Sequence, residues 1–293
     1  MTERDFQGKE IKLKGKEFTV QEPIGSLYFV HGISANWVDY TMLLVPLKNM
    51  GFNVFAYNQR GHGNSPGQYD PKIAADDLEH ILENEAPSSR LGIIGHSIGC
   101  YTALEVVKRY ESTGWLIDGV FMIEPFLGMD FLNLPQRYCI KALSKIASPL
   151  KVVDRWLNSA EKFREKNGFH QRDVIASYAS LAGLHSDDVK GIETKVGFML
   201  TDNDEVLGTS NKKHFYNCLK RIWKVCPNYT DHSVEVSGLN HCLNANKNDM
   251  SPFLNDNPLK YSKDPDLHAQ MLAKRANIVY RIGKFFRSAF ENT

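Results

Sequence analysis

The sequence lacks a surplus of charge, a long apolar run and a secretory leader, and each absence excludes a class of protein. Its 35 basic and 34 acidic side chains leave a net charge of +1. Binding to nucleic acid phosphates needs a basic surplus, so we expect no nucleic acid partner. No apolar run is long enough to cross a bilayer. The first seven residues carry acidic side chains and no apolar core, which argues against a secretory signal.

Cysteine is also scarce, and its pattern suggests no pairing. The chain has five cysteines, an odd number without a C-x-x-C motif: Cys100, Cys139, Cys218, Cys226 and Cys242. We therefore expect free thiols in a reducing compartment. The sequence has no H-E-x-x-H motif and no paired Cys/His spacing, so we expect neither a metal nor a cofactor. These features predict a cytoplasmic protein and leave peripheral membrane contact open.

What is present is an alternation of buried strands and amphipathic helices. After two short strands expected at 10–13 and 17–21, apolar runs predict strands at 26–30, 53–57, 90–95, 119–123, 195–200 and 233–236. Helical spacing of apolar residues predicts helices at 37–50, 72–85, 98–110, 210–225 and 267–289. Such alternation with short loops is typical of an α/β fold with a mostly parallel central sheet and helices on both faces. The final helix combines apolar and basic residues, so it either lies on a membrane surface or, as we favour, packs on the sheet.

The alternation breaks between residues 126 and 190. This segment has no convincing buried strand, and we expect helices at 138–150, 152–166 and 173–182. Either these helices thicken one face of the core, or they form an inserted cap over an active site. We expect a core made of 1–125 and 191–293 with a helical cap insertion at 126–190. The cap is rich in apolar side chains that suit a fatty acyl chain or simply pack on one another: Phe126, Leu127, Phe131, Leu132, Leu143, Ile146, Leu150 and Trp156.

A serine nucleophile is indicated by the motif Gly95-His96-Ser97-Ile98-Gly99. The motif G-x-S-x-G is common by chance, but here it follows a buried strand and opens an apolar helix. A sharp strand-to-helix turn needs small residues at both ends and exposes the serine hydroxyl at the carboxyl end of the sheet. The helix N-terminus beneath Ser97 favours developing negative charge.

A serine hydroxyl needs a base and an acid that orients it, in the chain order serine, acid, histidine. His241 follows the last strand and is the expected base. The loop after the 195–200 strand offers the acid, and we prefer Asp204 over Asp202 and Glu205. Glu124, at the end of the fourth buried strand, is a further alternative. For the oxyanion we expect the backbone N–H groups of two residues, Ile33 and Ile98.

Five segments together resemble the α/β-hydrolase superfamily, most closely its monoacylglycerol lipase and lysophospholipase branch. They are Phe29–Gly32, Asn58–Ser65, Gly95–Gly99, Thr201–Val206 and Gly238–His241. The resemblance implies the α/β-hydrolase fold with an inserted cap, and a serine hydrolase of lipid-like acyl esters acting through an acyl-enzyme. It also implies that the 58–65 segment is a structural loop, although Asn58 stands where the family usually has Asp.

Two other activities share these residues. A thioesterase or acyltransferase uses the same triad, and a non-catalytic ligand-binding protein can retain the fold. The expected partner is in each case a small molecule, for the leading hypothesis an ester with an acyl chain.

Overall fold

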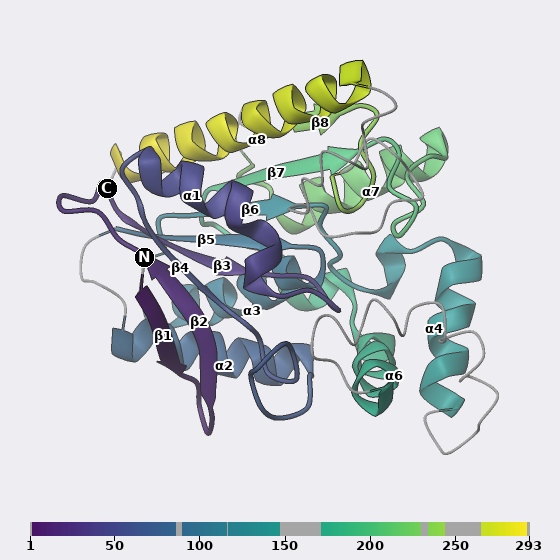
Figure 1. The fold of residues 1–293 in the computed structure, drawn as a ribbon. Helices are drawn as coiled ribbons and strands as arrows, with labels where there is room; N and C mark the ends of the chain where they lie inside the picture. Colours follow the sequence, from purple (N-terminus) through teal and green to yellow (C-terminus); the bar gives the residue numbers. More distant parts are fainter. Residues whose placement is uncertain are drawn as a thin grey trace.

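The computed structural model describes residues 2–85, 90–115, 117–146, 171–229, 234–243 and 265–291. In these ranges eight strands form one sheet in the order β1-β2-β4-β3-β5-β6-β7-β8 (Figure 1). Two pairs of neighbouring strands are antiparallel, β1 with β2 and β2 with β4, and the other pairs are parallel. The strands are β1 (Thr2–Gln7), β2 (Lys12–Phe18), β3 (Ser26–Val30), β4 (Asn53–Tyr57), β5 (Leu91–His96), β6 (Gly119–Ile123), β7 (Val196–Thr201) and β8 (Val234–Val236).

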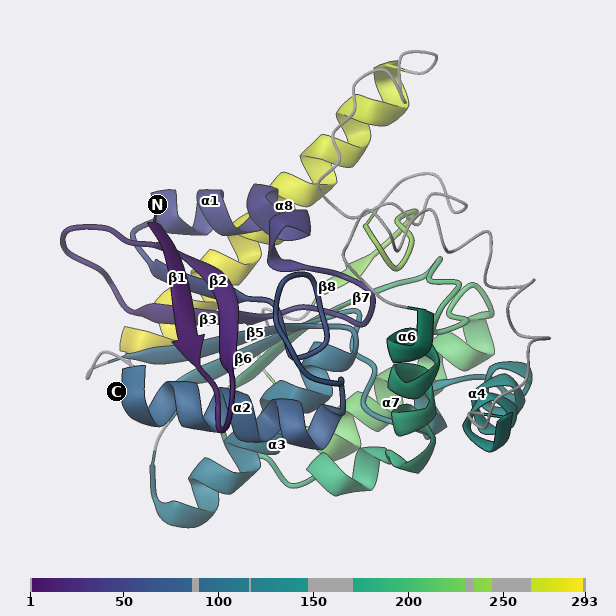
Figure 2. The same cartoon turned by 60° about the horizontal axis from the view of Figure 1, so that its bottom comes forward.

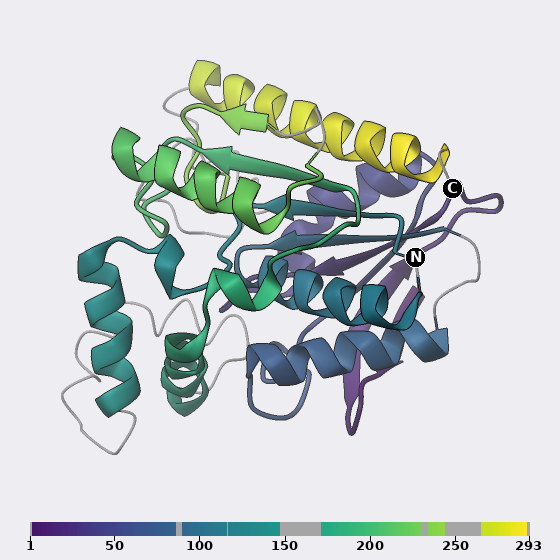
Figure 3. The same cartoon turned by 180° about the vertical axis from the view of Figure 1, so that it is seen from behind.

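Helices cover both faces of this sheet, as the sequence predicts. On one face lie α1 and α8, and on the other α2, α3 and α7 (Figures 1 and 3). The helices are α1 (Thr41–Asn49), α2 (Pro71–Glu85), α3 (Ile98–Thr113), α4 (Leu134–Ile146), α6 (Gln171–Ser180), α7 (Lys212–Val225) and α8 (Pro265–Glu291). Short 3₁₀ turns are η1 (Trp37–Tyr40), η2 (Met129–Phe131), η3 (Leu181–Gly183) and η4 (Ser186–Val189).

The two helical layers explain why the central strands are apolar throughout. Alternate residues of β3 face opposite layers: Leu27 and Phe29 pack with α1 and α8, whereas Tyr28 and Val30 pack with α2, α3 and α7. All five residues of β3 are buried. A strand that is covered on both faces exposes neither side to water, so its sequence is a nearly continuous run of apolar residues.

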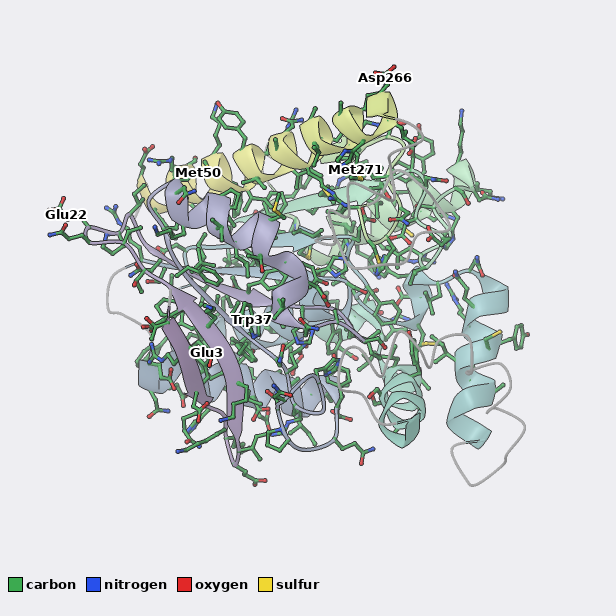
Figure 4. All side chains as sticks on the ribbon, in the orientation of Figure 1. Glu3, Glu22, Trp37, Met50, Asp266 and Met271 are labelled. Carbon is green, nitrogen blue, oxygen red and sulfur yellow. The ribbon has the colours of Figure 1, made fainter. Side chains whose placement is uncertain are left out.

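The long helix α8 packs against the sheet over glycines in three neighbouring strands. A Cβ on Gly119 of β6 would lie 3.0 Å from the Phe285 ring, and one on Gly197 of β7 would lie 2.9 Å from it. Gly92 of β5 makes the same room for Phe286. Met271 of α8 and Met50 beyond α1 belong to the same apolar layer (Figure 4). The packing alternative for this helix is therefore confirmed.

The N-terminal hairpin differs from the expected strands at 10–13 and 17–21. β1 and β2 form a ladder that pairs Thr2 with Glu17 and Gln7 with Lys12 at the edge of the sheet (Figure 2). Gly15 lies inside β2 rather than in a turn. A Cβ at this position would overlap the Ala56 carbonyl oxygen of the neighbouring strand and lie 2.7 Å from the Phe6 ring. β1 was missed because Phe6 is its single buried side chain.

The segment 126–190 is helical where it is described, and its helix boundaries differ from the expected ones. α4 begins at Leu134, four residues before the expected start at 138. Pro135 does not end the helix, because it lies in the first turn, where an N–H would have no partner within the helix. α6 replaces the helix expected at 173–182, and the helix expected at 152–166 lies outside the described residues. α4 and α6 pack together outside the helical layers of the sheet (Figures 1 and 3). Among the described residues, no helix combines the length and apolarity that a membrane span requires.

Candidate active site

Ser97 lies in the tight turn between β5 and α3. Its backbone has φ 54° and ψ −123°, a conformation that costs about 1–3 kcal/mol in a residue with a side chain. The flanking glycines allow the turn, because a Cβ on Gly95 would lie 2.7 Å from the Cys100 Cα and one on Gly99 would overlap the Val30 carbonyl oxygen. The turn is fixed further by the Ser97 N–H, which donates to the carbonyl of Ile123 at 2.9 Å.

Three side chains from distant parts of the chain form a continuous hydrogen-bonded series at this turn. The Ser97 hydroxyl lies 2.9 Å from Nε2 of His241, and Nδ1 of the same ring lies 2.6 Å from Oδ2 of Asp204. Because the carboxylate only accepts, Nδ1 carries the proton and Nε2 is free to accept from serine. Ser97 is 5% exposed, His241 6% and Asp204 0%, so water competes little for these bonds. The structure thus brings together the three residues that the sequence predicts.

The acid loop, residues 201–209, aims the Asp204 carboxylate. The Leu207 N–H donates to Oδ1 at 2.8 Å, which leaves Oδ2 for the imidazole. The Asp204 N–H donates to the Thr209 hydroxyl, and that hydroxyl donates to the Thr201 carbonyl. Burial opposes ionisation of Asp204, but the neighbouring imidazole and the donated hydrogen bonds keep its pKa below the ordinary value.

The other acids of this loop have different partners. Asp202 accepts from the Gly238 N–H at 2.9 Å and from the Ser237 hydroxyl at 3.0 Å, so it ties two loops together. Glu205 is exposed at the surface, and the desolvation of its carboxyl group is the largest cause of its raised pKa. Neither carboxylate forms the hydrogen bond to the His241 ring that Asp204 forms.

Glu124 lies beside the series although it is not bonded to the imidazole. It follows β6 with φ 46°, is 0% exposed, and accepts from the Thr201 N–H through Oε1 at 2.9 Å. Polar atoms of Glu124, Asp204 and His241 lie within 4.8 Å of one another, a spacing that a cation site also has. However, the aspartate and the histidine are already bound to each other at 2.6 Å, so the trio fits a proton network better than a metal site.

The His241 loop, residues 237–243, is held by α8. Lys274 donates to the carbonyl of Ser237 at 2.6 Å, and the buried Arg275 donates to the carbonyl of Leu243 at 3.1 Å. The loop also braces itself, since the Leu243 N–H donates to the Asn240 carbonyl. α8 therefore fixes the position of the expected base.

His96, the second residue of the elbow motif, has a defined hydrogen-bonding role. Its Nε2–H donates to the backbone carbonyl of His241 at 3.1 Å, and its Nδ1 accepts from the Tyr40 hydroxyl at 2.8 Å. The pKa of His96 is lowered to about 3, mainly by burial and to a smaller extent by the nearby His241. The ring is therefore neutral, and it links η1 to the residue expected to act as base. The sequence signal that could have revealed it is its place inside the elbow motif.

Of the expected oxyanion donors, Ile98 follows Ser97 in the chain, and Ile33 belongs to a loop that approaches the serine. Ile98 is the first residue of α3, so its N–H has no partner within the helix. The loop that carries Ile33 approaches the serine closely, because a Cβ on Gly32 would lie 3.0 Å from the Ser97 Cβ. His31, which precedes it, is buried and lies 2.8 Å from the Gly32 carbonyl through Nδ1. Burial lowers the pKa of His31 to about 4, so this neutral ring supports the loop without adding charge.

The side chains of the 58–65 segment form buried structural contacts away from the series at Ser97. The Asn58 side chain accepts from the N–H of Trp37 (Figure 4) at 2.9 Å, a bond that does not require a carboxylate. Arg60 forms a two-pronged, buried ion pair with Asp77, with both N–O distances 2.7 Å. Neither Arg60 nor His62 belongs to the hydrogen-bonded series at Ser97.

Four apolar side chains at the start of the 126–190 segment are part of the core. Phe126, Leu127, Phe131 and Leu132 are each at most 4% exposed and pack in the cluster beneath α2, α3 and α7. The 126–190 segment is also tied to the acid loop, because the Gln136 side chain of α4 donates to two carbonyls of that loop, at 2.9 and 2.7 Å.

A mostly parallel sheet with a nucleophile elbow, and a histidine and acid on later loops, defines an α/β hydrolase. Comparison with known families is more specific. The profile of the family described as "Serine aminopeptidase, S33" (Hydrolase_4) matches residues 21–224, which is well over half of the chain. The protein therefore belongs to this family of α/β hydrolases.

Similar proteins include enzymes that are named for different substrates. A lysophosphatidylserine lipase, ABHD12, from Xenopus tropicalis is 23% identical over 219 residues, covering 73% of this chain and 51% of its own. A proline iminopeptidase from Saccharolobus solfataricus is 28% identical over 109 residues, 34% of each chain. The chain thus spans only 34–51% of the length of these curated relatives. The solved structure of a thermophilic esterase from Thermogutta terrifontis has a TM-score of 0.59 at 14% identity, covering 95% of this chain and 99% of its own, which shows the fold.

Proposed function

We propose that this protein is a serine hydrolase that cleaves carboxylic esters through an acyl-enzyme on Ser97. The observation that carries the proposal is the unbroken series of hydrogen bonds from Ser97 through His241 to Asp204, at 2.9 and 2.6 Å. A serine, an imidazole with a free Nε2 and a buried carboxylate are the parts that activate a hydroxyl for acyl transfer.

In the proposed reaction, His241 takes the Ser97 proton as the hydroxyl attacks the ester carbonyl. Asp204 stabilises the imidazolium that forms, and the N–H groups of Ile33 and Ile98 hold the oxyanion. Loss of one such donor typically costs about 3–4 kcal/mol of transition-state stabilisation. His241 then gives the proton to the leaving alcohol, and water repeats the sequence to release the acid.

For the substrate we propose a lipid-like acyl ester, such as a monoacylglycerol or lysophospholipid. The similarity to the lysophosphatidylserine lipase supports this class. We also propose that 126–190 forms a cap on a core made of 1–125 and 191–293. The bonds from Gln136 to the acid loop support a cap at the carboxyl end of the strands, where substrate reaches Ser97.

We further propose a cytoplasmic location, with any membrane contact peripheral. The structure describes all five cysteines, forms no disulfide among them and buries three, which suits a reducing compartment. α8 does not support a membrane-surface role, since its apolar residues Ile278, Ile282 and Phe285 are at most 2% exposed.

The experiment is labelling with a fluorophosphonate probe, followed by a panel of aryl esters of increasing acyl length. We expect the wild type to label and Ser97→Ala to lose labelling, while the control Ser112→Ala, at an exposed helix end, labels normally. Equal labelling of wild type and Ser97→Ala, or none in either, would refute the hydrolase proposal. A preference for acetyl over long acyl groups would refute the lipid-like substrate, and matched thioester and proline-amide substrates test the other activities.

A further inference from the structure

The proposed reaction leaves one buried acid without a task. Glu124 has no exposed surface, and its backbone is fixed at the end of β6, where its N–H donates to the Met199 carbonyl at 2.9 Å. Oε1 accepts from the Thr201 N–H. No N–H or O–H group of the described residues donates to the other oxygen, Oε2, in the way that an ionised carboxylate requires.

The neighbouring carboxylate explains this arrangement. Glu124 and Asp204 belong to a group whose polar atoms lie within 4.8 Å of one another, and two buried carboxyl groups this close do not both ionise. The negative charge is more stable on Asp204, since this carboxylate accepts hydrogen bonds from both the His241 ring and the Leu207 N–H. Glu124 accepts from a single N–H. The proton shared by the pair therefore resides on Glu124.

We propose that Glu124 is a positioning residue that acts as a neutral carboxylic acid, whose O–H donates to Asp204 and keeps that carboxylate ionised and aimed at His241. The assignment deepens the proposed function, on which its catalytic part rests. It also gives Oε2 of Glu124 a partner, because a protonated oxygen donates where a carboxylate oxygen only accepts.

The surroundings of Glu124 agree with a neutral group. The pKa of Glu124 is raised well above its ordinary value, mainly by burial and to a smaller extent by the charge of Asp204. The other titratable groups that it faces are thiols with raised pKa values: Cys100 on α3, and Cys218 on α7, whose pKa is raised to about 12 by burial. Apart from the His241 imidazole, the facing groups that the structure describes therefore offer no positive charge to hold Glu124 ionised.

Two substitutions separate the neutral acid from an ionised one. Glu124→Gln keeps an oxygen for the Thr201 N–H and an N–H to donate to Asp204, so it mimics the neutral acid. We expect it to keep kcat within about threefold of wild type and to leave the acid limb of the pH–rate profile in place. Glu124→Leu removes the donor, and we expect kcat to fall about 10- to 100-fold with little change in KM, as for loss of a hydrogen bond to a charged group. Glu205→Gln is the matched control on the adjacent loop.

An ionised Glu124 gives a different result. Removing a negative charge within about 5 Å of the imidazole would move the acid limb of Glu124→Gln to lower pH by about two units, and this shift would overturn the proposal. So would a Glu124→Leu enzyme with the kcat of wild type. Thermal melting of each variant separates loss of folding from loss of positioning.

The infrared spectrum provides a readout that does not depend on activity. At neutral pH the difference between wild type and Glu124→Gln should contain the carbonyl stretch of a protonated carboxylic acid, and its absence would overturn the assignment. If this band is present but no ester or other acyl substrate is cleaved, the proposed function fails while the protonated Glu124 stands.

Discussion

Replacement of Asp204 by asparagine should move the proton of the His241 ring from Nδ1 to Nε2, rather than only weaken the hydrogen bond to the ring. The Leu207 N–H points at Oδ1 of Asp204 from 2.8 Å and needs an acceptor. The asparagine oxygen therefore takes that place, and its NH₂ group faces Nδ1 of His241. The ring then carries its proton on Nε2, where it can no longer accept the proton of Ser97.

The size of the effect follows from what the productive tautomer would cost. It would bring two buried N–H donors face to face, at about 1–3 kcal/mol for each unsatisfied donor. The imidazolium that forms during attack would also lose its charge-assisted hydrogen bond, worth about 1.5–3 kcal/mol. Together these costs predict a fall in kcat of roughly three to six orders of magnitude.

The assay is steady-state hydrolysis of an aryl ester, with the fluorophosphonate labelling rate as a second measure of Ser97 reactivity. Asp202→Asn is the control, because Asp202 is exposed to solvent and binds Ser237 and Gly238 instead of the imidazole. We expect it to keep kcat within about twofold. An Asp204→Asn enzyme with more than about a tenth of the wild-type kcat would refute the reasoning.

Three other perturbations test separate features. Gly99→Ala should abolish folding or activity, since its Cβ would overlap a carbonyl oxygen, whereas Gly183→Ala, where a Cβ meets nothing within 4 Å, should melt as wild type does. The pKa values of His31 and His96 are lowered by burial to about 4 and about 3. The free energy of unfolding should therefore be highest above about pH 6.5 and fall by about 1.4 kcal/mol per pH unit for each ring as the pH falls towards 4, because the unfolded chain then binds protons that the folded protein does not. Urea titrations at several pH values measure this free energy, and a value that does not change with pH would contradict the prediction. Gln136→Ala should lower kcat/KM for long-chain esters about tenfold but not for acetyl esters, because it removes two hydrogen bonds between α4 and the acid loop; equal losses for both would contradict the cap proposal.

The fold could be predicted because its central strands carry an unambiguous pattern. Strands such as β3 and β6 are buried on both faces, so their sequences contain nothing but apolar and small residues. β1 gives no such signal, since it lies at the sheet edge and buries Phe6 alone. Edge strands take their structure from pairing with a neighbour, which a local pattern does not record.

The candidate site, too, could be predicted from the sequence only in part. Ser97 and His241 follow from chain order and from the turn that the elbow motif requires. The choice of Asp204 over Asp202 depends on which carboxylate the Leu207 N–H orients, a detail of one turn. Glu124 was only an alternative acid, because its place between Thr201 and Asp204 arises from the pairing of β6 with β7, which sequence spacing does not reveal.

The packing of α8 has a consequence for how the protein is made. Its phenylalanines fill the space above Gly92, Gly119 and Gly197, and two of its basic residues hold the loop of His241. Because α8 follows the eight strands in the sequence, the face of the sheet around these three glycines is uncovered in a chain synthesised only as far as β8. We expect the docking of α8 to cover this apolar surface and to fix the His241 loop in the same step. A variant truncated before α8 should therefore expose apolar surface and aggregate.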